Sequence, residues 1–188
     1  MNLPNGLTIS RIVLVPLLVV VLLTKFEGHQ ILGVSKELIG AAIFALASLT
    51  DWLDGWLARK KGMVTVLGQL LDPTADKLLI ASALICLVDL GRVPAWAACV
   101  IIGREIAVTG FRAMASSKGI NIPASAFGKA KMGSESWIIG ALVLGPIYLG
   151  KVYIAAQIGL WLVFALALIS ALEYFVRFGP KIISQPVE

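Results

Sequence analysis

The sequence predicts an all-α membrane protein that crosses the bilayer with six helices. Of its 188 residues, 59% are hydrophobic and only 14% are charged, which is less polar surface than a soluble domain of this size carries. The mean hydropathy of +0.91 agrees with that interpretation. Six apolar segments also come near the roughly 17–25 residues that a membrane-spanning helix needs.

The six predicted spans follow one another along the chain, separated by short polar or turn-forming stretches. The N-terminal apolar run is long and no small-residue cleavage site follows it, so we interpret it as a span and not as a signal peptide. No internal repeat divides the chain, and residues 1–188 are expected to form one domain. The spans cover about Leu7–Leu23, Leu38–Ala58, Ala75–Leu90, the residues from Pro94 to Ser116, Ser134–Leu149 and Val152–Phe178.

Basic residues are divided unequally between the two sides of this arrangement. With the N-terminus in the cytoplasm, eleven basic residues fall on the cytoplasmic side and four on the other side. Cytoplasmic loops are enriched in Lys and Arg, so both termini are expected to be cytoplasmic. Because the basic residues are spread over short loops, a nucleic-acid partner is not expected. The eleven are Arg11, Arg59, Lys60, Lys61, Lys77, Arg112, Lys118, Lys129, Lys131, Arg177 and Lys181, and the four are Lys25, Lys36, Arg92 and Lys151.

Two pairs of aspartates stand at the cytoplasmic ends of the second and third spans. Asp51 and Asp54 are spaced i, i+3, and Asp72 and Asp76 are spaced i, i+4, so each pair shares one face of a helix. A short polar link, Lys60 to Leu67, makes the two helices antiparallel and brings the pairs together. Carboxylates at this depth are costly and mark a functional site.

The chemistry of these four side chains favours divalent metal. Clustered carboxylates repel one another unless they are protonated or paired with cations. Oxygen ligands suit Mg²⁺ or Mn²⁺ better than zinc, and two such ions suit a phosphoryl-type displacement. Structural alternatives exist for single residues: Asp72 before Pro73 can cap a helix N-terminus, and Asp54 can pair with Arg59 or Lys61.

The complete pattern resembles the signature of the CDP-alcohol phosphotransferase family. It runs Asp-x-x-Asp-Gly-x-x-Ala-Arg from Asp51 to Arg59 and, after eight residues, Gly-x-x-x-Asp-x-x-x-Asp from Gly68 to Asp76. The resemblance implies a six-helix fold, usually a homodimer, with a cytoplasmic site in the cell membrane. It implies that the four acids bind two divalent cations and that Asp76 is the general base. The residues implied for CDP-lipid binding are Gly55, Ala58, Arg59 and Gly68.

The acceptor alcohol must be inferred from other residues. Arg104 lies about ten residues into the fourth span and shares a helix face with Val108 and Arg112. With Lys129 and Lys131 of the next loop, these basic groups can form a site for the acceptor phosphate, although Arg104 can instead pair with Glu105. The stretches Arg104–Arg112 and Ala124–Lys131 resemble family members that use sn-glycerol 3-phosphate. Met132 and Glu135 depart from the usual pattern, which has Thr and Gln there.

The sequence therefore predicts transfer of a phosphatidyl group from CDP-diacylglycerol to glycerol 3-phosphate, with release of CMP. The same chemistry with another acceptor (inositol phosphate, serine or phosphatidylglycerol) remains open. A divalent-cation transporter is the alternative outside the class, but it should show interrupted helices near the midplane or inverted repeats, and neither is evident. Dependence of CMP release on metal separates the enzyme from the transporter.

Overall fold

The protein, described here by a computed structural model, is built almost entirely from helices. The structure describes residues 3–24, 30–31, 33–61, 66–117 and 126–183, and it describes side chains within 9–24, 33–50, 74–117, 134–173 and 175–176. Each of the six predicted segments corresponds to one long helix, which confirms the all-α class. These helices are α1 (Leu3–Leu23), α2 (Lys36–Lys61), α3 (Val66–Asp89), α4 (Ala95–Ser117), α5 (Ala126–Leu144) and α7 (Tyr153–Ile183).

Four short elements complete the described chain. Strands β1 (Gln30–Ile31) and β2 (Val34–Ser35) pair antiparallel between α1 and α2, a small departure from the all-helical prediction. The fifth predicted segment ends at Leu144 instead of Leu149, because Gly145 has a φ of 80° and a proline follows it. Helix α6 (Pro146–Leu149) and the 3₁₀ turn η2 (Gly150–Val152) then lead into α7.

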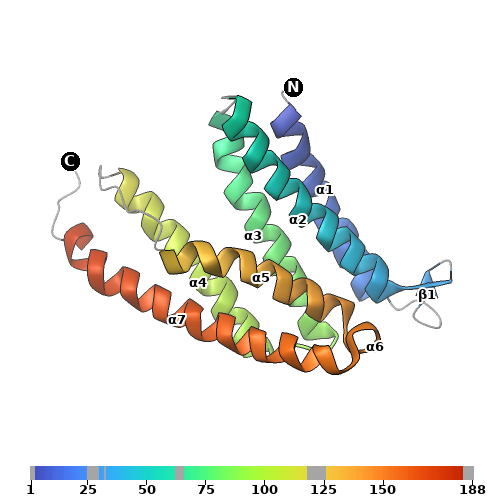
Figure 1. Cartoon of the computed structure of the whole chain (residues 1–188). Helices are drawn as coiled ribbons and strands as arrows, with labels where there is room; N and C mark the ends of the chain where they lie inside the picture. The colour runs from blue at the N-terminus through green and yellow to red at the C-terminus, as the bar shows by residue number, and fades with distance from the viewer. Residues whose placement is uncertain (1–2, 25–29, 32, 62–65, 118–125, 184–188) are drawn as a thin grey trace.

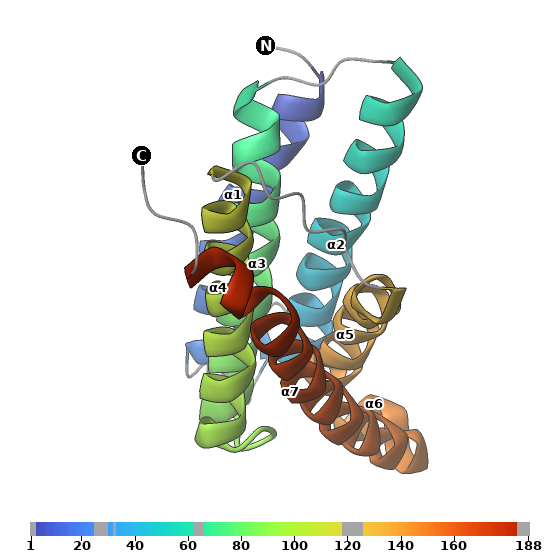
Figure 2. The same ribbon diagram turned by 90° about the vertical axis from the view of Figure 1, so that its left-hand side faces the viewer.

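The helices form two groups that meet at one end of the molecule. Helices α1, α2 and α3 lie side by side, and α4, α5 and α7 extend away from them (Figure 1). Helix α1 packs on α2 and α3, while α5 packs on α7 and α2 and links the two groups. Figures 1 and 2 agree that the start of α1, the end of α2 and the start of α3 lie at one end, opposite the β1–β2 hairpin.

The core lies where the first three helices and α5 meet. Gly40 of α2 lies against Leu22 of α1, because a Cβ added to Gly40 would lie 2.5 Å from Leu22 Cδ2, and a larger residue there would require the Leu22 side chain to shift. Burial of these apolar side chains stabilises the packing of helix on helix. The fully or almost fully buried core side chains include Leu18, Leu22, Phe44, Ala47, Leu79, Leu84, Leu87, Ile139 and Leu142.

One helical stretch of the described chain, Pro146–Glu173, is long and apolar enough to cross a membrane, and Ile9–Leu23 and Ser134–Leu144 are shorter apolar helices. Large apolar side chains along α7 are exposed, among them Ile158 and Leu162 at 57% and 60%. Exposed apolar surface of this extent is typical of contact with lipid or with another protein. The number of spans and the side of the membrane on which the termini lie stay predictions.

Candidate active site

The four motif aspartates are all carried by helices that meet at one end of the bundle. Asp51 and Asp54 fall in the second half of α2, and Asp72 and Asp76 fall in the first half of α3. That end of α2 and the start of α3 lie at the same end of the molecule in both views, and Figure 2 shows them spaced apart there (Figures 1 and 2). The structure therefore bears out the antiparallel arrangement of the two acid-bearing helices. The side chains of the first three aspartates lie outside the described residues.

Helix α3 begins earlier than the sequence predicted. The boundary near Ala75, with Asp72 as a helix cap and Pro73 at the first helical position, is wrong because α3 starts at Val66. Asp72 thus lies inside the helix, one turn before Asp76. The i, i+4 spacing of these two residues consequently falls within continuous helix, as the interpretation of a shared face requires.

Both acid pairs continue the buried faces of their helices. On α2, Phe44, Ala47, Asp51 and Asp54 recur at helical spacing, and the first two are buried with 2% and 0% exposure. On α3, Asp76 is in register with Ile80, Ala83 and Leu87, all of them buried. Helical register thus aligns the motif positions with the buried residues of α2 and α3.

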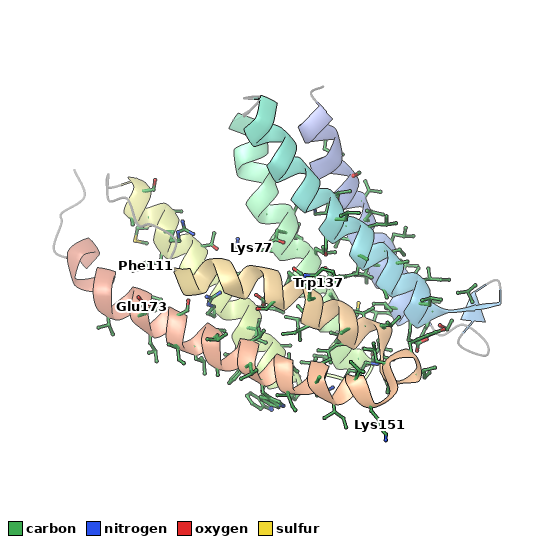
Figure 3. The ribbon with its side chains drawn as sticks, in the orientation of Figure 1. Lys77, Phe111, Trp137, Lys151 and Glu173 are labelled. Carbon is green, nitrogen blue, oxygen red and sulfur yellow. The ribbon has the colours of Figure 1, made fainter. Side chains whose placement is uncertain are left out.

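Asp76 is the one motif acid whose side chain is described, and it is half-buried. Lys77 follows it on α3, and in Figure 3 its side chain lies between α3 and the α4–α5 pair. Among the residues whose side chains are described, no group of three or more His, Cys, Asp or Glu is close enough to hold a metal ion. Asp51, Asp54 and Asp72 are not among those residues.

Arg104 occupies a different environment from Arg112, the exposed basic residue further along α4. Its side chain is 9% exposed and forms an ion pair with Glu105, which is the alternative that the sequence left open. Its Nε donates to Ala167 O of α7 at 3.2 Å, and its Nη2 donates to Ser170 Oγ at 2.7 Å. Arg104 therefore joins α4 to α7.

The remaining residues predicted for the acceptor phosphate lie on α4 and α5. Arg112 is exposed two turns after Arg104, and Val108 between them is buried. The rings of Phe111 and Phe175 pack edge to face with centroids 5.2 Å apart, which holds this part of α4 against α7. Lys129 and Lys131 belong to α5, and their side chains lie outside the described residues, as do those of the CDP-lipid residues Gly55, Ala58, Arg59 and Gly68.

The roles of two residues near this region were missed by the sequence interpretation: Arg11 of α1 is fully buried, and Ser170 of α7 holds Arg104. Glu135 of α5, which the sequence marked as a departure from the usual pattern, is buried at 4% exposure. A charged residue inside an apolar run was a usable signal for Arg11, which we had counted only as a topological marker. Ser170 offered no comparable signal, because a serine in a membrane helix is common.

Comparison with known proteins defines the class to which this fold and motif belong. The family model of the CDP-alcohol phosphatidyltransferases matches residues 1–169, and the chain belongs to that family. It is 40% identical over 183 residues to the CDP-diacylglycerol–glycerol-3-phosphate 3-phosphatidyltransferase of Bacillus subtilis, covering 94% of each chain. The enzyme of the same name from Rickettsia felis is 35% identical over 176 residues, covering 93% of each.

A third relative is the probable phosphatidylglycerophosphate synthase of Mycobacterium tuberculosis, 39% identical over 176 residues that cover 94% of this chain and 81% of that one. The matched stretches of these three relatives cover 93–94% of this chain. The family and the long apolar helix together indicate a membrane-bound transferase.

Proposed function

We propose that this protein transfers the phosphatidyl group of CDP-diacylglycerol to sn-glycerol 3-phosphate, giving phosphatidylglycerophosphate and CMP. The observation that carries the proposal is the register of the acid motif, in which both pairs continue the buried faces of two adjacent antiparallel helices. The names of the relatives at 35–40% identity supply the donor and the acceptor. Its place is phospholipid biosynthesis.

The motif fits two divalent cations of the Mg²⁺ or Mn²⁺ type. Four carboxylates, spaced i, i+3 on α2 and i, i+4 on α3, offer oxygen donors from two helices at one end of the bundle. Asp51, Asp54, Asp72 and Asp76 would hold the ions. When bound, the ions neutralise the pyrophosphate and the charge that develops during the displacement.

The protein's own part is to orient the two substrates and to move one proton. The hydroxyl oxygen of the acceptor forms a bond to the lipid-side phosphorus, the bond from that phosphorus to the bridging oxygen breaks, and CMP leaves with the electron pair. Asp76 accepts the hydroxyl proton, a role that its half-buried place on the inner face of α3 supports. Gly55, Ala58, Arg59 and Gly68 would bind the nucleotide end.

The acceptor phosphate is a dianion that approaches a cluster of carboxylates, so positive charge must offset the repulsion. Arg104, Arg112, Lys129 and Lys131 are proposed to supply it. Arginine grips phosphate through two hydrogen bonds, whereas lysine acts as a point charge. Arg104 is already oriented by Ala167 and Ser170 of α7, which supports a fixed and not a mobile contact.

We further propose the membrane arrangement that the sequence predicted. The six long helices cross the cell membrane, both termini and the motif end of α2 and α3 face the cytoplasm, and two copies associate as a homodimer. The exposed apolar side chains of α7 support contact with lipid or a second copy. Efficient labelling of a cysteine at Lys61 from outside intact cells would contradict this orientation.

An acceptor panel tests the reaction. Purified protein is given CDP-diacylglycerol and, in separate reactions, glycerol 3-phosphate, inositol phosphate, serine or phosphatidylglycerol, and CMP release is measured with and without excess chelator. We expect release with glycerol 3-phosphate and loss of release in chelator. Release with a different alcohol would overturn the acceptor, and undiminished release in chelator would overturn the metal. Metal uptake without CMP release from any acceptor would favour the transporter.

A further inference from the structure

Arg11 is the only charged residue in the sequence of α1, and its side chain is 0% exposed. A charge so placed is expensive unless other groups compensate it. Its Nε donates to the backbone carbonyl of Ala47 on α2 at 3.3 Å. The side chain therefore reaches across the α1–α2 interface instead of extending toward a membrane surface, as a residue that only marked topology would do.

The carbonyl of Ala47 receives more than one donor. Thr50 Oγ1 also donates to it, at 2.7 Å. Because α2 is α-helical from Lys36 to Lys61, the same carbonyl is the one that accepts the backbone N–H of residue 51 in an α-helix. Arg11 and Thr50 thus act on the turn of α2 that leads directly to Asp51, the first residue of the acid motif.

Helix α1 and the two helices on which it mainly packs offer few acids that could compensate Arg11. Helix α1 has no Asp or Glu, and it packs mainly on α2 and α3. On α2, Glu37 lies ten residues before Ala47, about 15 Å along the helix, and pairs with Arg92. On α3, Asp89 is the last residue, at the opposite end from the motif. The acids that remain on these two helices are the four aspartates of the motif.

We propose that Arg11 is a positioning residue for the acid motif: it holds the turn of α2 from Ala47 to Asp51 and offsets part of the charge of the four carboxylates. The inference rests on the proposed function, in which these carboxylates hold divalent cations. It adds a third helix, α1, to a site that the motif itself assigns to α2 and α3 alone. Arg11 touches no reacting atom and acts through the residues that do.

The test measures Mn²⁺ binding and stability as well as turnover in the purified full-length protein. Mn²⁺ binding without substrate is followed by the electron paramagnetic resonance signal of the free ion, and stability by thermal unfolding in detergent. The variant Arg11→Met keeps most of the side-chain volume and removes the charge. We expect it to stay folded, to bind Mn²⁺ about 10–100-fold more weakly and to lose turnover to a similar extent, which is the usual effect of removing a group that supports metal ligands.

Two further variants and one control separate charge from geometry. Arg11→Lys keeps the charge and should recover much of the Mn²⁺ affinity. Thr50→Val removes the other side-chain donor to the Ala47 carbonyl and should have a smaller effect in the same direction. Ser48→Ala is the matched control, since Ser48 Oγ is buried without a hydrogen-bond partner in the described structure, and it should leave binding unchanged.

The possible outcomes distinguish this inference from the proposed function. If the wild-type protein binds Mn²⁺ and Arg11→Met binds it equally well with normal turnover, Arg11 is structural and the inference fails alone. If Arg11→Met only lowers the unfolding temperature, with normal Mn²⁺ affinity in the folded protein, the inference fails in the same way. If the wild-type protein binds no Mn²⁺ and its turnover persists in chelator, the metal assignment and this inference fail together.

Discussion

The two ends of the α1–α3 group use the same kinds of charged residue in different ways. We define the hairpin end by Lys36, Glu37, Arg92 and Gln157. The charged side chains at this end hold helices together. Lys36 Nζ donates to Leu22 O at 3.0 Å, and Arg92 Nη1 donates to Leu142 O and Val143 O at 2.9 and 2.6 Å. The motif end, which we define by Asp51, Asp54, Asp72 and Asp76, carries acids of two helices, and we propose that these acids bind metal ions.

The chemistry of the hairpin end explains this difference. The last carbonyls of a helix have no partner within the helix, and Lys36 and Arg92 donate to carbonyls in the last turns of α1 and α5. Arg92 also pairs with Glu37 at 3.5 Å, with side chains only 12% and 8% exposed, and its own carbonyl accepts from Gln157 Nε2 at 3.1 Å. Substitutions at the hairpin end should therefore affect stability, and substitutions at the motif end should affect turnover.

The largest effect on turnover is expected from Asp76→Asn at the motif end. The amide keeps the shape of the side chain but cannot accept the proton of the acceptor hydroxyl, so CMP release should fall by about 10²–10⁴-fold. The thermal unfolding midpoint in detergent should stay close to that of the wild-type protein. Near-normal turnover would remove Asp76 from the catalytic role, and a large loss of stability would show that the two ends do not differ as proposed.

The opposite pattern is expected from Arg92→Met at the hairpin end. This change leaves Glu37 buried without its partner and takes a donor from Leu142 O and Val143 O, which should lower the free energy of unfolding by about 3–5 kcal/mol. Turnover per folded molecule, measured well below the unfolding midpoint, should be nearly normal. In the double variant with Glu37→Gln, the loss of unfolding free energy should be smaller than the sum of the losses in the two single variants. Additive losses would show that Arg92 and Glu37 are not coupled.

Much of this arrangement could be predicted from the sequence, because long apolar runs interrupted by Gly, Pro and charged residues mark helices strongly. The predicted start of α3 was wrong. Asp72 followed by Pro73 is a sequence typical of a helix N-terminus, but the helix already begins at Val66. The structural roles of Lys36 and Arg92 could not be predicted from the sequence either. A count of basic residues by side treats them as topological markers, and only the fold shows that both are largely buried and bonded to carbonyls distant in sequence.

The environment of Arg104 was predictable in part for a similar reason. The pairing of Arg104 with Glu105 was an alternative visible in the sequence because the residues are neighbours. Its bonds to Ala167 O and Ser170 were not visible, because they join helices more than 60 residues apart. Serine and alanine in an apolar helix carry no pattern that indicates such a contact, so the orientation of Arg104 is a property of the packing of α4 on α7.

A smaller effect on turnover is expected from Ser170→Ala. It removes one hydrogen bond to the charged guanidinium of Arg104, worth about 1.5–3 kcal/mol, and part of that loss should appear as a KM for glycerol 3-phosphate raised up to about tenfold. The KM for CDP-diacylglycerol should not change. Ser170→Thr keeps the hydroxyl and is the matched control. A rise in the KM for CDP-diacylglycerol alone would assign Arg104 to the donor side.

The smallest effect is expected at the hairpin end, where the loss of stability on substitution by alanine should differ between Gly91 and Gly145. Gly91 and Gly145 both have positive φ, 68° and 80°, so alanine at either position carries a similar backbone strain of about 1–2 kcal/mol. Their surroundings differ: a Cβ at Gly91 meets nothing within 4 Å, whereas a Cβ at Gly145 would lie 2.7 Å from Cζ and both Nη atoms of Arg92.

Arg92 cannot easily move aside, because Leu142 O, Val143 O and Glu37 hold its guanidinium. Gly145→Ala should therefore lower the free energy of unfolding by about 1 kcal/mol more than Gly91→Ala, the worth of roughly one hydrogen bond. In the Arg92→Met background the two alanine variants should become equal, because the obstacle is gone. Equal losses in the wild-type background would mean that Arg92 yields freely, and the hairpin end would then be held by its apolar packing instead of by its charges.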